Sequence, residues 1–145
     1  MRLPVIIVWL LIANGLLAQP SAGLKTIDQW IRMWNSYDLL AVDSLFNDQA
    51  TYFSSEYAGL ITGLDNLRLH HQKFGFVRGG RQTGNTLWLE NLHVQAAGAE
   101  ALIVTATWYF LRKDATRPQH GPVTFVVGRI AGQWKILHAH FANNP

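Results

Sequence analysis

Four strand-like runs, rich in β-branched and aromatic residues, follow one another through the C-terminal part of this sequence at 86–94, 101–111, 123–130 and 134–141. Short connections at 96–100 and 131–133 and a polar stretch at 112–121 join them. Consecutive strands linked in this way pair antiparallel. The pattern therefore predicts a meander of long antiparallel strands, which can pack one face on helices and present the other to a partner.

The residues before these strands have the periodicity of helices. Two segments each place their apolar residues on one helical face, namely Ile27, Trp30, Ile31 and Trp34 in the first and Leu39, Val42, Leu45 and Phe46 in the second. Thr26 and Asp38 are the expected N-caps, and the second helix should end at Asn47. A short strand at 50–53, a turn at 59–63, a third helix at 64–74 capped near Asp65 and a glycine-rich loop at 75–84 follow. Helices first and strands afterwards predict an α+β fold.

The composition excludes several classes of protein. With 145 residues, 49% of them hydrophobic and only 14% charged, the chain is expected to form one globular domain rather than a disordered segment. It contains no cysteine, which rules out disulfides, thiol nucleophiles, zinc fingers and a cysteine-linked lipid anchor. Its Lys and Arg residues are scattered rather than grouped in a stripe, so nucleic acid is not an expected partner.

Residues 1–18 have the pattern of a secretory signal peptide. Arg2 precedes an almost wholly apolar stretch from Leu3 to Ala18, and its length of about 16 residues is at or below that of a spanning helix. Cleavage after Ala18 would leave a single domain at 19–145 that is periplasmic or secreted, with no attachment to the membrane. An uncleaved anchor is the alternative, because Leu16 is a mediocre residue three positions before a cut.

Two stretches of the sequence resemble a known family. Trp-Asn-Ser-Tyr-Asp-Leu at 34–39, then Leu45-Phe46, a short strand and Gly-Leu-Ile-Thr-Gly at 59–63 resemble the opening of SnoaL-like proteins of the nuclear transport factor 2-like superfamily. The last strand, at 132–141, is similar to that of the association (hub) domain of calcium/calmodulin-dependent protein kinase II and its bacterial relatives. The resemblance spans about residues 26–143. It specifies fold better than function, because this superfamily hosts isomerases, cyclases, dehydratases, hydrolases and non-catalytic assembly domains.

The resemblance implies a cone, in which a strongly curved antiparallel sheet wraps around three helices, encloses a pocket and often forms a dimer through its outer face. Matching the strands to those of the related ketosteroid isomerases implies that the following side chains enter the cone: Tyr52, Ser54, Glu56, His70, Val104, Ala106, Trp108, Phe110, Thr124, Val126, Leu137, Ala139 and Phe141. The same parity points Trp134, Ile136, His138 and His140 outward. A homodimer is expected, because Trp134 and Ile136 would otherwise expose apolar area to water.

The sequence departs from two activities of that superfamily. Where ketosteroid isomerases have a tyrosine, a base aspartate and an oxyanion-hole aspartic acid, this sequence has Trp30, Ser54 and Thr124, so ketosteroid isomerisation is not expected. The kinase hub holds carboxylates with several arginines, of which Arg129 matches one, and Phe141 stands in place of another. That ligand preference is not expected either.

Glu56 is the leading candidate for a catalytic group. It lies on a stretch expected to line the pocket, where a carboxylate could act as a general base. His70, if it points inward, would form an acid/base relay with Glu56 and Tyr52. The alternatives are that Glu56 caps a turn at the rim and that His70 and His71 are ordinary residues of the helix surface or core edge. The candidate ligand-binding residues are Trp30, Ser54, Trp108, Phe110, Thr124 and Phe141.

Two further patterns carry weaker predictions. His138 and His140 share one face of a strand and could ligate zinc with a third ligand. The sequence has no HExxH motif and no acidic neighbour of this pair, so contacts at a subunit interface or with adjacent strands are expected instead. The glycine-rich segment 75–80 lacks the Lys-Ser/Thr of a phosphate-binding loop and precedes a strand, which favours a lid over the pocket. No metal and no organic cofactor is expected.

Three functions stay open at this point. The first is an exported isomerase, cyclase or dehydratase that acts by general acid/base catalysis on a small hydrophobic oxygenated molecule. The second is a non-catalytic module that binds such a molecule, and the third is an assembly domain with a vestigial pocket. Converging polar groups in the cone would favour the enzyme, an apolar cavity the binding module, and a filled cone the assembly domain.

Overall fold

The computed structural model describes residues 13–145, and these form three helices and a six-stranded sheet. In chain order the elements are α1 (Ala13–Ser36), α2 (Leu39–Leu45), β1 (Phe46–Phe53), β2 (Leu60–Thr62), α3 (Leu64–Lys73), β3 (Thr86–Ala96), β4 (Ala101–Leu111), β5 (Gln119–Ile130) and β6 (Gln133–Phe141). The prediction of an α+β fold, with three helices before the long strands, is confirmed.

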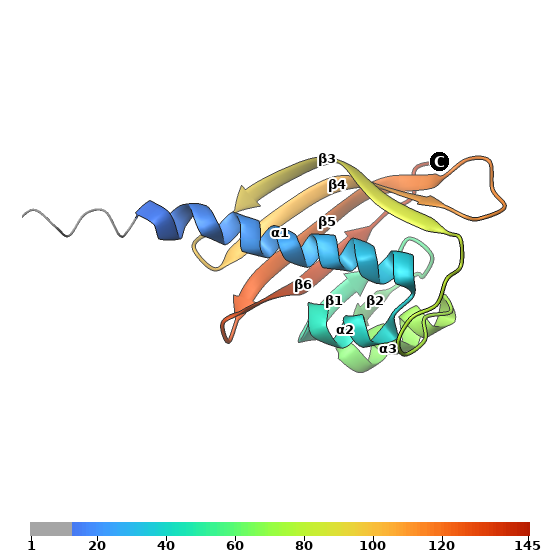
Figure 1. Ribbon diagram of the computed structural model, residues 1–145, viewed down its shortest axis with the longest axis horizontal. Coiled ribbons are helices and arrows are strands. Elements are labelled where there is room, and N and C mark those ends of the chain that lie inside the picture. Colours follow the sequence, from blue (N-terminus) through green and yellow to red (C-terminus); the bar gives the residue numbers. More distant parts are fainter. Residues whose placement is uncertain (1–12) are drawn as a thin grey trace, which may run out of the picture.

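The sheet is strongly curved and has the strand order β2-β1-β6-β5-β4-β3 (Figure 1). Strands β3 to β6 form the predicted antiparallel meander. Strand β1 pairs with β2 antiparallel but with β6 in parallel, so that Tyr52 lies beside Ala139. The sheet was expected to be antiparallel, so this parallel pair is a difference. It can form because β1 and β6 are far apart in the chain and no hairpin sets their direction.

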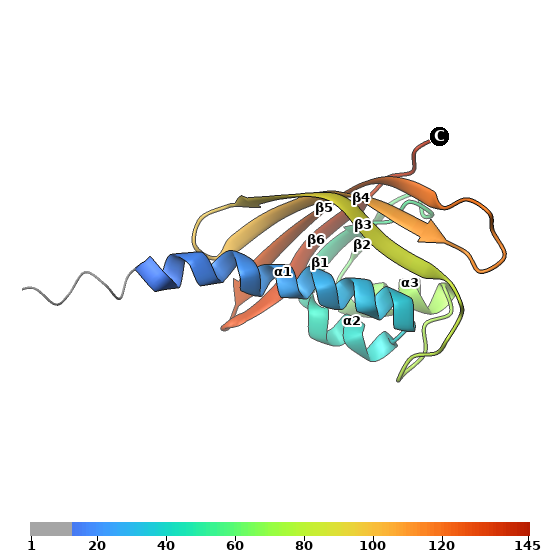
Figure 2. The ribbon, with the colours of Figure 1, turned by 45° about the horizontal axis from the view of Figure 1, so that its top comes forward.

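Helix α1 lies across the concave face of the sheet, as Figure 2 shows. Its buried face includes Ile27, Trp30 and Trp34, in agreement with their helical spacing. Gly23 permits the close approach of helix and sheet, because a Cβ at this position would collide with Leu102 and lie 3.2 Å from the Trp134 ring. Helix α1 therefore lies close to the sheet from Gly23 onward.

Helix α1 begins earlier than predicted. Thr26 lies inside the helix instead of capping it, and its hydroxyl donates a hydrogen bond of 3.4 Å to the carbonyl of Trp134. This hydroxyl is used to hold the helix on the sheet, so it is not free to cap a helix end. The expected cleavage point after Ala18 falls within α1, and residues 1–12 of the expected signal peptide lie outside the described part of the chain. Among residues 13–145, no helix has the length and apolar character needed to cross a membrane.

Helix α2 starts at its predicted cap. The carboxylate of Asp38 accepts a hydrogen bond of 3.0 Å from the amide of Leu40, which satisfies an amide that the helix itself leaves free. The helix ends at Leu45, before the predicted end at Asn47, and Phe46 already belongs to β1. Phe46 is almost fully buried, so its apolar side chain serves the core from a strand rather than from the helix.

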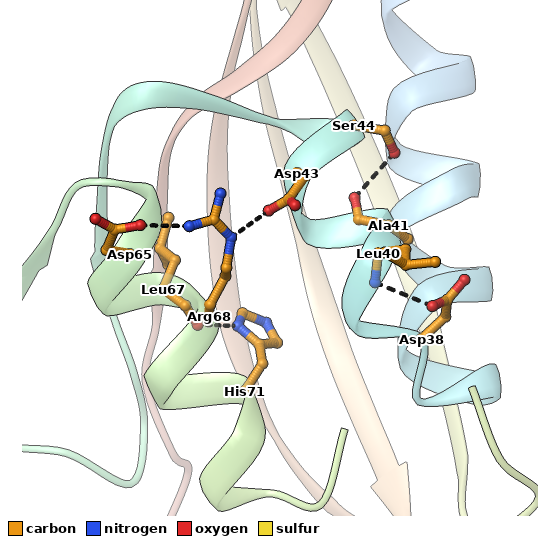
Figure 3. Close-up of polar contacts among 9 residues, drawn as sticks. All are labelled: Asp38, Leu40, Ala41, Asp43, Ser44, Asp65, Leu67, Arg68 and His71. Atoms are coloured by element: carbon orange, nitrogen blue, oxygen red, sulfur yellow. Dashed lines mark hydrogen bonds and ion pairs between the residues drawn. The ribbon is translucent and has the colours of Figure 1, made fainter. Parts of the chain in front are cut away.

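Helix α3 is tied to α2 by one arginine. Figure 3 shows Arg68 between Asp43 of α2 and Asp65 of its own helix, and the Nε atom of Arg68 lies 2.6 Å from Asp43. Gly63, not Asp65, occupies the N-cap position, and Asp65 lies in the first turn. The arginine therefore fixes α3, which carries His70, relative to α2.

A bulge in β6 reverses the predicted orientation of the residues at its start. Ile136 and His138 pair with consecutive residues of β5, which leaves Leu137 without a partner. Ile136 is fully buried and Trp134 packs against the core, while Leu137 is only partly buried. The prediction that Trp134 and Ile136 point outward is therefore wrong. The dimer was expected because these two residues would expose apolar area, so that reason for a dimer no longer holds.

Strand β5 also has the opposite parity to the one predicted. Phe125 is fully buried, with its ring 5.0 Å from that of Trp30. Its neighbour Thr124 is only partly buried and pairs with the exposed His140, and Val126 is likewise only partly buried. The prediction that Thr124 and Val126 enter the cone is wrong, because matching a strand one residue out of step exchanges its two faces.

Candidate functional site

The cone contains one end that is not completely filled. A cavity there is lined by Trp30, Trp34, Tyr52, Ser54, Ser55, Glu56, His70, Phe74, Leu87, Trp108, Phe110, Arg112, Gln119 and Phe141. We call it the aromatic pocket. Its volume is about 50 Å³, and at roughly 10–15 Å³ for each water this is room for roughly four water molecules or one small ring.

Packed rings form the walls of the aromatic pocket. The ring of Trp30 is stacked on that of Phe141, with 5.4 Å between centroids. Trp108 is held by its indole Nε1, which donates a hydrogen bond of 2.9 Å to the carbonyl of Ala142 after the end of β6. Trp34 packs edge-on against Phe110 at 6.1 Å. These contacts fix the wall before any ligand arrives.

Tyr52 and His70 bring polar atoms into this wall. Their rings lie 5.4 Å apart, one on β1 and the other on α3. Burial raises the pKa of Tyr52 well above its usual value. Burial, assisted by the charge of Lys73, lowers the pKa of His70 to about 4. Both side chains are therefore uncharged at neutral pH.

Neither polar group of this pair is satisfied by the protein. The Nε2 atom of His70 is buried without a hydrogen-bond partner, and no described residue forms a hydrogen bond with the hydroxyl of Tyr52. The indole Nε1 atoms of Trp30 and Trp34, which also belong to lining residues, are unpaired too. Unpaired buried polar atoms are rare in folded proteins and call for an explanation.

His71 lies behind this wall, in the core. Its Nδ1 is 2.8 Å from the carbonyl of Leu67, as Figure 3 shows, and because a carbonyl only accepts, Nδ1 carries the proton. Burial lowers the pKa of His71 to about 4, although the bond to Leu67 acts against this. The two adjacent histidines thus differ, since His70 lines the pocket and His71 does not.

Glu56 lines the pocket, as expected, but at its rim and not in its interior. It is exposed at the rim of the pocket, and the amide of Gln119 donates a hydrogen bond of 2.9 Å to its carboxylate. Within the described residues no direct hydrogen bond joins Glu56 to Tyr52 or His70, and the acid/base relay of these three residues stays a prediction. The hydroxyl of Ser54 accepts from the amide of Glu56 at 3.1 Å, which forms a turn that directs the carboxylate to the rim.

The structure brings the predicted site residues together with one exception. All of them line the aromatic pocket except Thr124, which lies on the outer face of β5. Their roles in binding or catalysis stay predictions. The residues that the sequence did not assign to the site are Trp34, Ser55, Phe74, Leu87, Arg112 and Gln119. Arg112 and Gln119 lie in a stretch expected to be a loop, and only the pairing of Gln119 with Phe110 places them at the pocket.

His138 and His140 lie on the outer face of the sheet, as predicted. The Nδ1 atom of His138 is 2.8 Å from the hydroxyl of Thr51 on the neighbouring strand β1. Burial, with a smaller effect of His140, lowers the pKa of His138. Within residues 13–145, no three His, Asp or Glu side chains are grouped so that they could hold a metal ion.

The glycine-rich loop after α3 is anchored. The amide of Arg81 donates a hydrogen bond of 2.7 Å to the carbonyl of Ser36, and the amide of Gly79 donates one of 3.0 Å to the carboxylate of Asp38. Phe76 is buried, with its ring 5.0 Å from that of Trp34. The structure thus shows a loop fastened to the turn between α1 and α2 in place of the expected lid.

Solved structures with the same fold are numerous, and three are instructive. A protein of unknown function from Pseudomonas putida KT2440, described as NTF2-like, has a TM-score of 0.75 at 20% identity, with 87% of each chain covered. A protein from Novosphingobium aromaticivorans DSM 12444, provisionally named a scytalone dehydratase, has a TM-score of 0.75 at 13% identity, covering 92% of this chain and 89% of that one. The CaMKII hub of S. rosetta has a TM-score of 0.71 at 24% identity, covering 86% and 96%. At these identities the likeness shows the fold alone.

The sequence itself identifies the family. The comparison with curated proteins gave no match. The family model described as the SnoaL-like domain matches residues 24–142, a segment that begins where α1 meets the sheet and ends just after β6. The chain therefore belongs to the SnoaL-like domain family, with the fold of nuclear transport factor 2-like proteins.

Proposed function

We propose that the aromatic pocket binds a small, largely apolar molecule that carries a neutral oxygen function such as a hydroxyl or carbonyl group. The observation that carries this proposal is the unpaired Nε2 atom of His70, whose ring lies 5.4 Å from that of Tyr52, in a wall of aromatic rings. A buried polar atom without a partner costs roughly 1–3 kcal/mol. A ligand oxygen between the two side chains would supply the missing hydrogen bonds.

Size and charge both narrow the choice of ligand. A cavity of about 50 Å³ is too small for a polycyclic molecule, so only a small part of the ligand can enter it fully. His70 and Tyr52 are uncharged at neutral pH, so they offer no counter-charge to an ion at the inner end of the pocket. The inner part of the ligand should therefore be uncharged, and its oxygen should belong to a neutral group.

Proton transfer on the bound molecule is the second candidate function. His70 is neutral at pH 7 and makes no hydrogen bond, so its Nε2 atom is free to accept a proton. Its lowered pKa and the raised pKa of Tyr52 make the two groups a weak base and a weak acid in the free protein, so catalysis would require a substrate that brings both pKa values toward neutrality. Glu56 reaches only the rim, through Gln119, so His70 and Tyr52 are the better placed acid/base pair. Isomerases, cyclases and dehydratases that use no cofactor rely on such pairs, and the N. aromaticivorans neighbour is named for a dehydratase.

The binding proposal is tested by filling the pocket. 2-Phenylethanol serves as the probe, with the quenching of tryptophan fluorescence as the signal. Ser54→Phe adds a ring inside the pocket, whereas Ser44→Phe makes the same change on the exposed surface of α2. Binding by the wild type and Ser44→Phe, with loss of at least about 10-fold in affinity for Ser54→Phe, supports the proposal. Equal affinity of all three proteins for the probe, or no binding by the wild type, contradicts it.

We also propose that the protein is exported and that residues 1–18 are removed. Loss of these residues would spare every contact between α1 and the sheet described here, because the close approach begins at Gly23 and the family match at residue 24. Cleavage after Ala18 would remove residues 13–18 of α1.

We also propose a homodimer through the outer face of the sheet, for a reason other than the one that the sequence suggested. Trp88, Tyr109 and His120 stack across β3, β4 and β5, with 5.2 and 5.3 Å between successive ring centroids. All three are only partly buried, and a second copy would cover them. Light scattering at micromolar concentration should report a dimer for the wild type and a monomer for Tyr109→Arg. A monomeric wild type would overturn this proposal.

A further inference from the structure

A second depression adjoins the aromatic pocket and carries positive charge. Lys73, Arg81 and Arg112 line it, together with the polar side chains of Thr83 and Asn85. Phe74, Phe110 and Arg112 belong to the walls of both depressions. We call the second one the basic groove, and the shared wall means that one ligand could occupy both.

The cations of the basic groove have no counter-charge. Within residues 13–145, the basic side chains that form ion pairs with carboxylates are Arg68 and Arg129, neither of which lies in the groove. No acidic residue lines the groove. Among the carboxylates outside the groove, Asp114 lines the next depression, Glu56 is bonded to Gln119 at the pocket rim, and Asp38 accepts a hydrogen bond from the amide of Gly79. Three like charges thus share one concave surface without neutralisation.

Aromatic rings position all three of these cations, and the ammonium of Lys73 lies 5.6 Å from the centre of the Tyr57 ring, which lines a neighbouring depression. The guanidinium of Arg81 lies over the ring of Tyr37 at 5.6 Å, and that of Arg112 over the ring of Phe110 at 5.7 Å. Gly75, at a φ of +88°, leaves space for Arg81, because a Cβ there would collide with the guanidinium. A guanidinium held by its flat face keeps the N–H groups along its edge available for hydrogen bonds.

The frame around the groove is held by Asn85. Its side-chain amide donates a hydrogen bond of 2.7 Å to the hydroxyl of Tyr37, and its side-chain oxygen accepts one of 2.9 Å from the amide of Lys113. Tyr37 lies beneath Arg81, and Lys113 follows Arg112. Asn85 therefore connects the supports of both arginines, and the spacing of their charges is set before a ligand binds.

We propose that the basic groove binds an oxyanion, above all a phosphate ester, on the same molecule whose apolar part enters the aromatic pocket. This inference rests on the proposed binding function. Three unpaired cations favour a dianionic group over a monoanionic one, and the planar edge of arginine matches phosphate oxygens in two parallel hydrogen bonds. The ligand would then be a small ring with a neutral oxygen at its inner end and a phosphate at the mouth.

The test compares three probes that share a 4-hydroxyphenyl ring. 2-(4-Hydroxyphenyl)ethanol is neutral, 3-(4-hydroxyphenyl)propionate is a monoanion and 2-(4-hydroxyphenyl)ethyl phosphate is a dianion, and all three keep the ring hydroxyl as the neutral oxygen for the inner end. Calorimetry on the wild type should give an affinity for the phosphate at least about 10-fold above that for the alcohol, with the carboxylate between them. Arg81→Gln should remove most of this advantage and leave the alcohol unaffected, because Arg81 lines only the groove. Arg117→Gln is the matched control, since it removes one exposed charge outside both depressions.

Each outcome decides a separate question. Equal affinity for the alcohol and the phosphate overturns the proposal that the groove binds phosphate, and the pocket proposal stands. An equal loss of phosphate affinity in Arg81→Gln and Arg117→Gln has the same consequence. If the alcohol fails to bind, the pocket proposal fails, and the groove is then judged with inorganic phosphate alone. Phosphate-dependent NMR shifts of the amides of Arg81 and Asn85 would support it, and unchanged spectra would overturn it.

Discussion

The rings of Tyr52 and His70 lie 5.4 Å apart although they come from the strand β1 and the helix α3. Their proximity depends on the position of α3, which Arg68 ties to α2. Both side chains are uncharged at neutral pH. The buried Nε2 atom of His70 has no hydrogen-bond partner in the described protein. Leaving a buried polar atom unpaired lowers the stability of the fold, and the two neutral side chains lie in the wall of an aromatic cavity.

Replacing either member of this pair should weaken binding of an oxygen-bearing probe. Tyr52→Phe and His70→Asn should each lower the affinity for 2-phenylethanol about 5-fold, the scale of one neutral hydrogen bond. Ethylbenzene, which has the same ring and no oxygen, should bind Tyr52→Phe as it binds the wild type. His140→Asn, on the outer face, is the control variant. An equal loss of affinity for both probes would show that the variants disturb packing and not a hydrogen bond.

Acid should destabilise the protein through the two buried histidines. Their pKa is about 4 in the folded protein, against an ordinary value of 6.5, so between these limits the unfolded chain binds more protons and stability falls as the pH falls. From pH 7.5 to pH 5 the loss should be about 2 kcal/mol for each histidine.

Urea unfolding at the two pH values checks this expectation. His71→Leu should show a loss smaller by about 2 kcal/mol, since it removes one of the two protonation sites. His140→Gln should behave like the wild type, because His140 is exposed. A pH dependence that is the same in His71→Leu and the wild type would contradict the prediction.

Gly121 should be required for the wall at Trp108. It pairs with Trp108 across β4 and β5, and a Cβ there would collide with the carbonyl oxygen of Ala142 and lie 2.8 Å from its carbon. That same carbonyl accepts the indole hydrogen bond of Trp108. Gly121→Ala should therefore destabilise the protein by about 1–3 kcal/mol in urea unfolding and also weaken binding of 2-phenylethanol. Gly128→Ala on the same strand is the control, because its Cβ would press mainly on the side chain of Leu137.

Export predicts a defined mass. The protein isolated from the cells that naturally produce it should begin at Gln19 or within a few residues of it, as measured by intact-mass spectrometry. A full-length chain recovered with the membrane fraction would establish the alternative, an uncleaved anchor.

The order of elements and most of the core could be predicted from periodicity. Trp30 and Trp34 repeat at helical spacing, and both are buried. The wrong predictions concern which residues of β6 and β5 face the cone. They occur where the alternation along the strand is interrupted or fits either face. The bulge at Leu137 adds one residue to β6 and turns Ile136 inward, and local sequence gives no sign of it. Strand β5 has consecutive apolar residues from Phe125 to Val127, so apolar side chains fall on both of its faces and alternation alone does not reveal that Phe125, and not Thr124, faces the cone.

The candidate site was harder to predict at its rim than in its interior. Trp108 and Phe110 are large apolar residues on one face of a strand, and both line the pocket. Gln119 reaches Glu56 only because the β4–β5 hairpin pairs it with Phe110. Arg81 and Arg112 are far apart in the sequence and share a groove through tertiary contacts alone. Such contacts have no local signal in the chain.

The central claim, that the aromatic pocket is a binding site, is tested most directly by the indole signals of the protein. Trp30, Trp34 and Trp108 line the pocket, whereas Trp88 and Trp134 do not. In an NMR titration with 2-phenylethanol, the indole N–H resonances of the first three should shift with a single saturable affinity, while those of Trp88 and Trp134 stay in place. Unchanged spectra, or shifts of equal size at all five residues, would contradict the account.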